Sequence, residues 1–366
     1  MSLPDQPARN PALEAAIRAN RDDPAPYHVY GDFLQSRGNP LGELLILEGR
    51  DPKRAAEIIK GLGLPAEDLA TFGWRRGLLQ WLRLENNRDW MDDKFDALGL
   101  VRPLFSSIAC CALEDLRIGV LRWESNDEDV PAVLEEAANH EWARGLVRLH
   151  LGDVDVDSVD IAMHCIGDVG GLITDSFPNL RFLRFHSGEY DDEEQKFGVA
   201  GLALPELREL VVETNVMRQS RLEALLAAEL QRLERLELWF GAEEYGADAT
   251  LDDLEPLLSG DVFPTVRHLA LRNCEFANDI ARALPSSAIA SRLESLDLSM
   301  GTLDDDAAIV LADQANVFSR LKKLSVDDSF LTATSLEPLR AKWRDALVSE
   351  EQKDIDDDYR YVSVSE

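Results

Sequence analysis

The chain has 366 residues and carries 69 Asp and Glu against 38 Lys and Arg, a formal charge of −31. A surface this acidic repels nucleic-acid phosphates and anionic membranes, so we expect neither as a partner. The sequence does not determine the oligomeric state, and we favour a monomer. The start, Met-Ser-Leu-Pro-Asp-Gln-Pro, lacks a basic and an apolar signal region, and no later stretch approaches 18 uncharged apolar residues, which predicts a cytoplasmic protein.

The first part of the chain reads as a disordered segment, residues 1–10, followed by a small helical cap, residues 11–78. Three helices are expected in the cap, over residues 12–20, 27–38 and 42–48, because acidic residues, glycine and proline interrupt the apolar periodicity between them. A repeat array needs such a cap, since its first strand would otherwise expose an unpaired edge.

From residue 79 to residue 326 one phrase, apolar-x-x-apolar-x-apolar, occurs nine times. All 27 template positions are apolar and 22 are leucine, in a chain that is 45% apolar. The nine sets are Leu79/Leu82/Leu84, Leu113/Leu116/Ile118, Leu146/Leu149/Leu151, Leu180/Leu183/Phe185, Leu207/Leu210/Val212, Leu233/Leu236/Leu238, Val266/Leu269/Leu271, Leu293/Leu296/Leu298 and Leu321/Leu324/Val326.

Helical periodicity appears between the phrases, for example over residues 130–138, 221–232 and 304–312. Each unit is then a short strand followed by a returning helix, so that neighbouring strands run parallel and the helices pack behind them. We therefore predict an α/β solenoid over residues 79–334, curved like a horseshoe with strands on the concave face and helices on the convex face.

This pattern resembles the leucine-rich-repeat family, in its long-repeat form typified by ribonuclease inhibitor. Asn87, Asn215 and Cys274 fit the family's ninth position, and the other repeats depart from it. In the cap, Tyr30-Gly-Asp-Phe-Leu34 and Gly42-Glu-Leu-Leu45 resemble a short bacterial repeat-companion domain. The resemblance implies interaction repeats and no known chemistry.

The end of the chain, residues 335–366, is expected to cap the other edge of the array. Residues 335–347 read as an amphipathic helix, residues 350–358 as a solvated acidic tail, and residues 360–364 as a closing strand.

Motifs of catalysis, phosphate binding and metal binding are missing from the sequence. We found no Gly-x-Ser-x-Gly, phosphate-loop, His-Glu-x-x-His or Cys-x-x-Cys pattern. The four cysteines are expected to be reduced and buried, including the adjacent pair Cys110 and Cys111. We therefore predict a non-enzymatic protein with no catalytic residue, no cofactor and no metal.

Strand alternation predicts which side chains face the concave surface. Arginines and aromatic residues, which dominate binding hot spots, gather on the N-terminal half of that surface. The predicted partner site comprises Trp81, Arg83, Arg117, Arg148, His150, Phe182, Arg184 and Trp239. Its expected ligand is an acidic peptide or protein segment, bound more tightly below about pH 6.5 if His150 and His186 titrate normally. The alternative is that these are ordinary strand positions paired with Asp115, Glu85 and their neighbours.

Three functions agree with the sequence. The first is a protein-interaction scaffold that binds on the concave face. The second is an acidic inhibitor of a cationic enzyme or toxin, whose association rate would fall steeply with salt. The third, a GTPase regulator, follows from the family resemblance.

Overall fold

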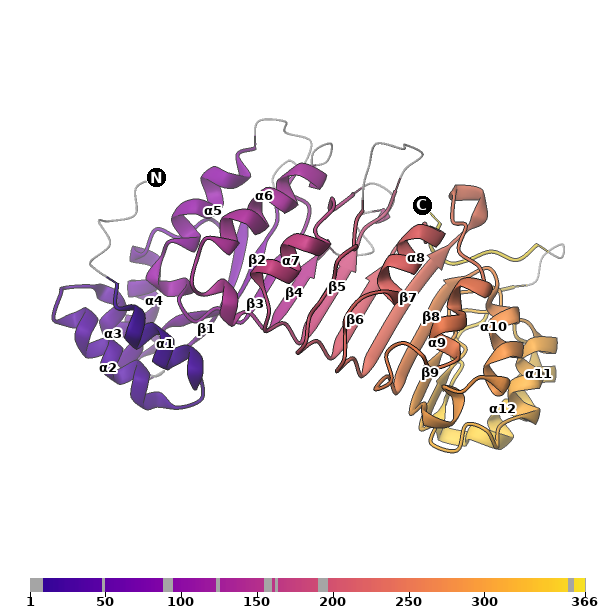
Figure 1. The fold of residues 1–366 in the computed structure, drawn as a ribbon. Helices are drawn as coiled ribbons and strands as arrows, with labels where there is room; N and C mark the ends of the chain where they lie inside the picture. The colour runs from indigo at the N-terminus through magenta and orange to yellow at the C-terminus, as the bar shows by residue number, and fades with distance from the viewer. Residues whose placement is uncertain are drawn as a thin grey trace. The chain divides into compact units, whose positions relative to one another are not determined.

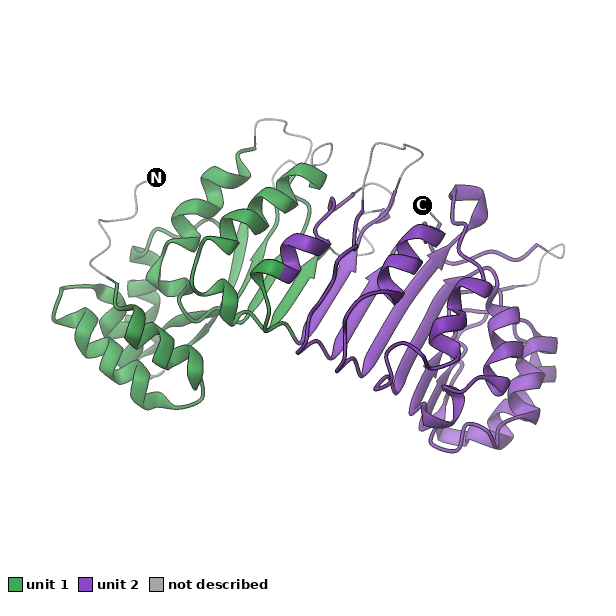
Figure 2. Cartoon of the chain, viewed as in Figure 1, with its two compact units in different colours: residues 1–154, 175–180 green, residues 155–174, 181–366 purple. Residues whose placement is uncertain are grey.

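A computed structural model describes residues 9–47, 50–87, 95–122, 126–154, 160–161, 164–189, 197–354 and 359–365 (Figure 1). The chain forms two compact units, residues 1–154 with 175–180 and residues 155–174 with 181–366 (Figure 2). Residues 1–8 of the predicted disordered segment lie outside the described residues. Within these ranges, no helix has the length and apolar content needed to cross a membrane.

The first unit begins with helices, as predicted. The three expected helices are present as α1 (Pro11–Ala19), α2 (Pro24–Gln35) and α3 (Pro40–Leu47), and a fourth, α4 (Pro52–Gly61), was not expected. Each of the four begins at a proline, whose missing N–H is not needed in a first turn. Side chains of Asn10, Asp23 and Asp51 cap α1, α2 and α4 by accepting first-turn N–H bonds.

Four strands follow or accompany the helices of the first unit. They are β1 (Ala70–Arg75), β2 (Leu78–Leu84), β3 (Asp115–Ile118) and β4 (Arg148–Leu151). Strands β2, β3 and β4 run parallel, and β1 pairs antiparallel with β2. The segment 11–78 is therefore not wholly helical as predicted, because β1 covers the edge of β2 directly. The helices α5 (Ala97–Phe105) and α6 (Asn126–Ala138) pack against each other.

The second unit continues the pattern with parallel strands in chain order. They are β5 (Phe182–His186), β6 (Glu209–Glu213), β7 (Arg235–Gly241), β8 (His268–Cys274), β9 (Ser295–Asp297), β10 (Lys323–Ser325) and β11 (Leu347–Val348). The helices are α8 (Gln219–Leu226), α9 (Glu255–Leu258), α10 (Ala277–Ala283), α11 (Asp305–Asp313) and α12 (Ala333–Trp343), while α7 (Gly170–Ser176) has residues in both units.

The core of each unit consists of the repeated phrase. Every template position except Leu321 is at most 1% exposed, so the predicted inward leucines are confirmed. Burying a leucine side chain fully stabilises a fold by roughly 1.5–3 kcal/mol, and each repeat buries several such side chains. The four cysteines are free and buried, as predicted.

The C-terminal end differs from the prediction. Helix α12 is present, but residues 359–365 form no strand. The edge of β10 is instead taken by β11, which pairs Leu347 with Leu324 and Val348 with Ser325. The main chain of residues 359–365 finds other partners, which are described below. Residues 355–358 of the predicted acidic tail lie outside the described residues.

Candidate functional site: the strand faces

The strand face of the first unit is organised around one carboxylate, that of Asp115 on β3. Asp115 is 7% exposed and accepts hydrogen bonds from Arg117, whose Nη2 lies 2.8 Å from Oδ2. Arg148 Nε lies 3.9 Å from the same oxygen, and His150 Nε2 lies 3.5 Å from Oδ1. Because β3 and β4 pair in register, Asp115 is adjacent to Arg148 and Arg117 to His150. Three predicted site residues therefore converge on one buried carboxylate.

The remaining predicted residues of this unit, Arg83 and Trp81, join the same surface. Arg83 Nε donates to Asp153 Oδ2 at 2.7 Å, and its Nη1 pairs with Glu85. The Arg117 guanidinium carbon lies 5.5 Å from the Trp81 ring centre, within the range of a cation–π contact. The hydrogen bonds that Arg117 donates to the Asp115 carboxylate raise the pKa of Arg117.

Charge on this surface is balanced rather than cationic. Three arginines face three carboxylates, those of Glu85, Asp115 and Asp153. The sequence predicted the position of the arginines and offered these pairings only as the alternative interpretation. An acidic partner would meet guanidinium groups that already have intramolecular partners.

His150 behaves differently from the prediction. Its side chain is 8% exposed, and burial lowers the pKa of the imidazole to about 4. The charges of Asp115 and Asp153 oppose this effect, and those of Arg117 and Arg148 reinforce it. The ring is therefore neutral throughout pH 5.5 to 8, and the expected tightening of binding through His150 in that range is wrong.

The strand face of the second unit contains the other three predicted residues. Phe182 and Trp239 are 8% and 7% exposed, so the aromatic side chains are mostly buried among their neighbours. Arg184 Nη2 lies 2.6 Å from Glu213 Oε2, which also lies 2.7 Å from His186 Nδ1. Burial raises the pKa of Glu213, but the hydrogen bond with His186 and the charge of Arg184 outweigh it and hold that pKa below its usual range.

A second ion pair involves the residues around Trp239. Glu237 accepts a hydrogen bond from Trp239 Nε1 at 2.9 Å and another from Arg272 Nη1 at 3.0 Å. The Arg272 guanidinium carbon lies 5.3 Å from the Trp239 ring centre, and the Trp239 ring meets His186 edge to face at 6.4 Å. The predicted aromatic residues thus hold neighbouring polar side chains in place.

The His186 and Glu213 pair is the arrangement most like a catalytic dyad. The His186 ring stacks on His164 with ring centres 5.3 Å apart, and burial lowers the pKa of His164 to about 3. His186 Nε2 is buried and has no hydrogen-bond partner among the residues that the structure describes. Among the described residues no three His, Cys, Asp or Glu side chains are grouped to hold a metal ion. Burial raises the pKa of Cys110 to about 12, which keeps that thiol protonated and unreactive.

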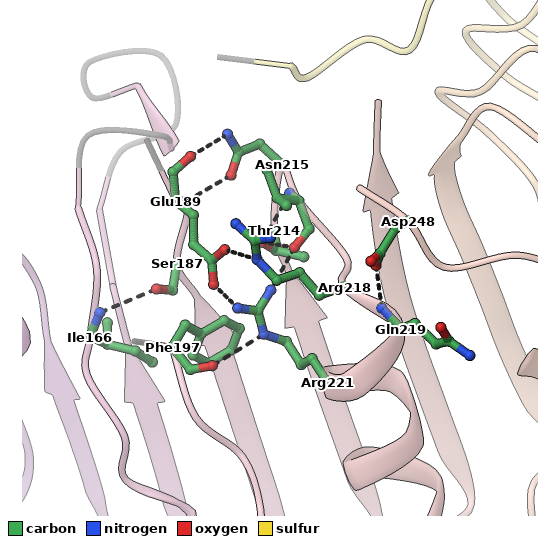
Figure 3. A network of polar contacts seen from close by, with 11 residues as sticks. Ile166, Ser187, Glu189, Phe197, Thr214, Asn215, Arg218, Gln219, Arg221 and Asp248 are labelled. Atoms are coloured by element: carbon green, nitrogen blue, oxygen red, sulfur yellow. Dashed lines mark hydrogen bonds and ion pairs between the residues drawn. The ribbon is translucent and has the colours of Figure 1, made fainter. Parts of the chain in front are cut away.

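Beyond the end of β5, a buried ion pair connects two repeats of the second unit (Figure 3). Glu189 and Arg221 are each 5% exposed and form a salt bridge, and Arg218 Nε lies 2.6 Å from Glu189 Oε2. Arg221 also donates to the main-chain oxygens of Phe197 and Val216 at 3.2 and 2.5 Å. Burial lowers the pKa of Arg221 to about 10, so it remains charged at neutral pH. The network joins Glu189 and Phe197 to the start of α8.

A pocket of about 710 Å³ lies among the loops that follow β7 and β8. The rings of Phe240 and Phe276 are among its walls. The five carboxylates that line it belong to Glu243, Asp248, Asp252, Glu275 and Asp279. Two of these already accept main-chain bonds, Asp248 from Gln219 and Glu275 from Glu243.

The comparisons with known proteins concern the fold. No protein-family model and no curated protein sequence matches the chain. Among solved structures it is similar to a Bacteroides fragilis protein from structural genomics, with a TM-score of 0.64 and 22% identity over 73% of each chain. It also matches an internalin from Listeria monocytogenes, with a TM-score of 0.36 and 15% identity over 71% of each chain.

The repeated parallel strands, each with its buried phrase, decide the fold. It is an α/β leucine-rich-repeat solenoid. In such a fold the residues between the template leucines face outward, and this rule located the predicted side chains. The alternative interpretation named Asp115 as a pairing partner, but the rule did not identify Glu213 and Glu237 as carboxylates that hold the predicted side chains. The only sequence signal for these residues was their place in the same outward columns.

Proposed function

We propose that the chain is a non-enzymatic interaction scaffold that binds a protein or peptide segment on its strand face. The observation that supports this is the fixed array of charges around Asp115. Intramolecular ion pairs hold Arg83 and Arg117 in place, so a partner would pay little side-chain entropy for them. Arg148 is the outermost guanidinium, 44% exposed and 3.9 Å from Asp115.

The partner we propose presents an acidic residue to Arg148. A carboxylate can bind a guanidinium through two parallel hydrogen bonds. The Trp81 ring, which contacts Arg117, offers the partner an apolar contact on the same surface. His150 takes no part in recognising the charge, since its ring is neutral at physiological pH.

Charge reversal tests this proposal. Arg148→Glu places a negative charge where the acidic segment would bind. Arg102→Glu is the matched control, because Arg102 lies on helix α5 of the same unit, is 61% exposed and also pairs with a carboxylate, that of Glu136. Each bait is used to capture proteins from the source cells, and the captured protein is then purified and titrated. We expect the partner to be retained by wild type and R102E and lost from R148E. Equal capture by all three baits would exclude this face.

A second function, inhibition of a cationic enzyme or toxin, is favoured by the pocket that Phe240 and Phe276 help to line. Its five carboxylates suit a lysine or arginine side chain of a partner. Asp252→Asn with Asp279→Asn should then slow association and weaken its dependence on ionic strength. The third candidate, a GTPase regulator, rests on the family resemblance alone.

We also assign the repeats to the long-repeat type and residues 11–78 to the bacterial repeat-companion class, and we place the protein in the cytoplasm. A full helix such as α6 between β3 and β4 supports the first assignment. The glycines of the two companion motifs, Gly31 and Gly42, support the second. They lie where α2 and α3 cross, and a Cβ on Gly42 would come within 2.6 Å of the Gly31 carbonyl oxygen.

A further inference from the structure

The turns after β8, β9 and β10 share an unusual backbone conformation. Asn273, Met300 and Asp328 each have a positive φ, of 50°, 68° and 49°. Each lies seven residues after the first template position of its repeat, and left-handed conformations are uncommon for residues other than glycine. Their N–H groups all donate to the next repeat, to the oxygens of Ser299, Asp327 and Glu351. The side-chain amide of Asn273 and the carbonyl oxygen of Met300 take no part in these three bonds.

Both of these groups contact the main chain of residues 359–365. Asn273 Oδ1 accepts a hydrogen bond from Val364 N at 2.8 Å, and Asn273 Nδ2 donates to Val364 O at 2.6 Å. Ser363 N donates to Met300 O at 3.0 Å, and Asn215 Nδ2 donates to Ser365 O at 3.5 Å. We call Asn215, Asn273, Met300 and Asp328 the ledge. Asn215, Asn273 and Met300 contact successive peptide groups of the segment, and the Asp328 carboxylate accepts a hydrogen bond from the Ser363 hydroxyl.

Side chains hold the upstream part of the segment. Arg360 Nη1 lies 2.5 Å from Asp304 Oδ2, and Val362 is 4% exposed. Lys353 Nζ donates to Tyr361 O at 2.9 Å and lies 5.1 Å from the Tyr361 ring centre. The Tyr361 ring itself meets Phe330 edge to face at 5.4 Å. Asp304 thus favours a basic residue at the position of Arg360, and burial favours an apolar residue at that of Val362.

We propose that the ledge is a binding surface for extended peptide segments, and that residues 359–365 are its intramolecular occupant, which a partner segment displaces. Recognition through Asn273 requires a peptide in extended conformation with a free N–H and carbonyl group. Extended peptides that add to the edge of a sheet are likewise recognised through main-chain hydrogen bonds. Since Asn273 is 0% exposed and both hydrogen bonds of its side-chain amide go to Val364, that amide would lose these partners if the segment left and nothing replaced it. This surface is separate from the strand face around Asp115, so the two proposals can fail independently.

The test uses full-length chains and a fluorescent peptide with the sequence of residues 359–365, followed by anisotropy. Val364→Pro removes the N–H that Asn273 binds and weakens the chain's own occupant, but leaves the ledge intact. A tethered segment acts at an effective concentration of about millimolar, so the free peptide should bind V364P roughly tenfold or more tightly than wild type. Adding Asn273→Gly, which keeps the left-handed backbone without strain, should abolish the gain.

The peptide provides a control that needs no protein variant beyond V364P. Methylation of its Val364 nitrogen removes the same hydrogen bond and should weaken binding to V364P by about tenfold or more. Absence of peptide binding to V364P would overturn the proposal. So would equal affinity of V364P for the plain and methylated peptides, or equal affinity of wild type and V364P for the plain peptide.

Discussion

Acidification from pH 7 to pH 5 should destabilise the first unit through His150. A histidine whose pKa is lowered by folding favours the folded state fully above its unfolded pKa, near 6.5, and loses that contribution as the pH falls toward the folded pKa. For His150 the folded pKa is about 4, so the relevant window runs from about pH 6.5 down to pH 4.

The magnitude follows from the two pKa values. At pH 5 the unfolded chain has bound a proton on His150 and the folded chain has not, so the free energy of unfolding falls by about 2 kcal/mol relative to pH 7. His164, with a pKa of about 3, should make a similar contribution in the second unit.

Two measurements check this. Histidine NMR signals should show that His150 does not titrate above pH 5. In urea unfolding at pH 7 and pH 5, His150→Gln should reduce the pH-dependent loss of stability by about 2 kcal/mol compared with wild type. The comparison cancels contributions of the carboxylates, which are common to both chains. Titration of His150 near pH 6.5, or the same pH dependence in H150Q and wild type, would refute the reasoning.

Two further predictions concern the second unit. Arg221→Met leaves Glu189 and two main-chain oxygens without their buried partner and should lower the free energy of unfolding, measured in urea, by about 3–5 kcal/mol. Arg218→Met removes a 42% exposed partner of the same carboxylate and should lower it by about 1 kcal/mol or less. Equal losses in the two variants would contradict the role given to burial. Gly241→Ala should lower the thermal midpoint of unfolding more than Gly246→Ala. Both glycines have a positive φ, but a Cβ on Gly241 would overlap the Asn215 main-chain oxygen, whereas a Cβ on Gly246 would have no atom closer than 3.9 Å. Similar midpoints would show that the contact at Gly241 relaxes easily.

The boundaries of the helices were predicted unevenly, for a local reason. Residues 221–232 carry helical periodicity, yet α8 ends at Leu226. Glu229 then forms a β-bridge with Ala203, a residue of the preceding repeat. The apolar residues near the end of the expected helix belong to this turn and lead into the next strand. Periodicity alone does not distinguish such residues from the last turn of a helix.

The sequence by itself determined the fold class, the register of the strands and the outward position of Arg83, Arg117, Arg148 and Arg184. It could do so because each repeat contacts only its neighbours, so the burial of one phrase depends on local spacing. Tertiary structure decided the chemistry of the surface. Arg83 pairs with Asp153, 70 residues away, and Val364 with Asn273, 91 residues away. Such contacts depend on side-chain conformation and on how the end of the chain returns to the repeats, and a periodic pattern predicts neither.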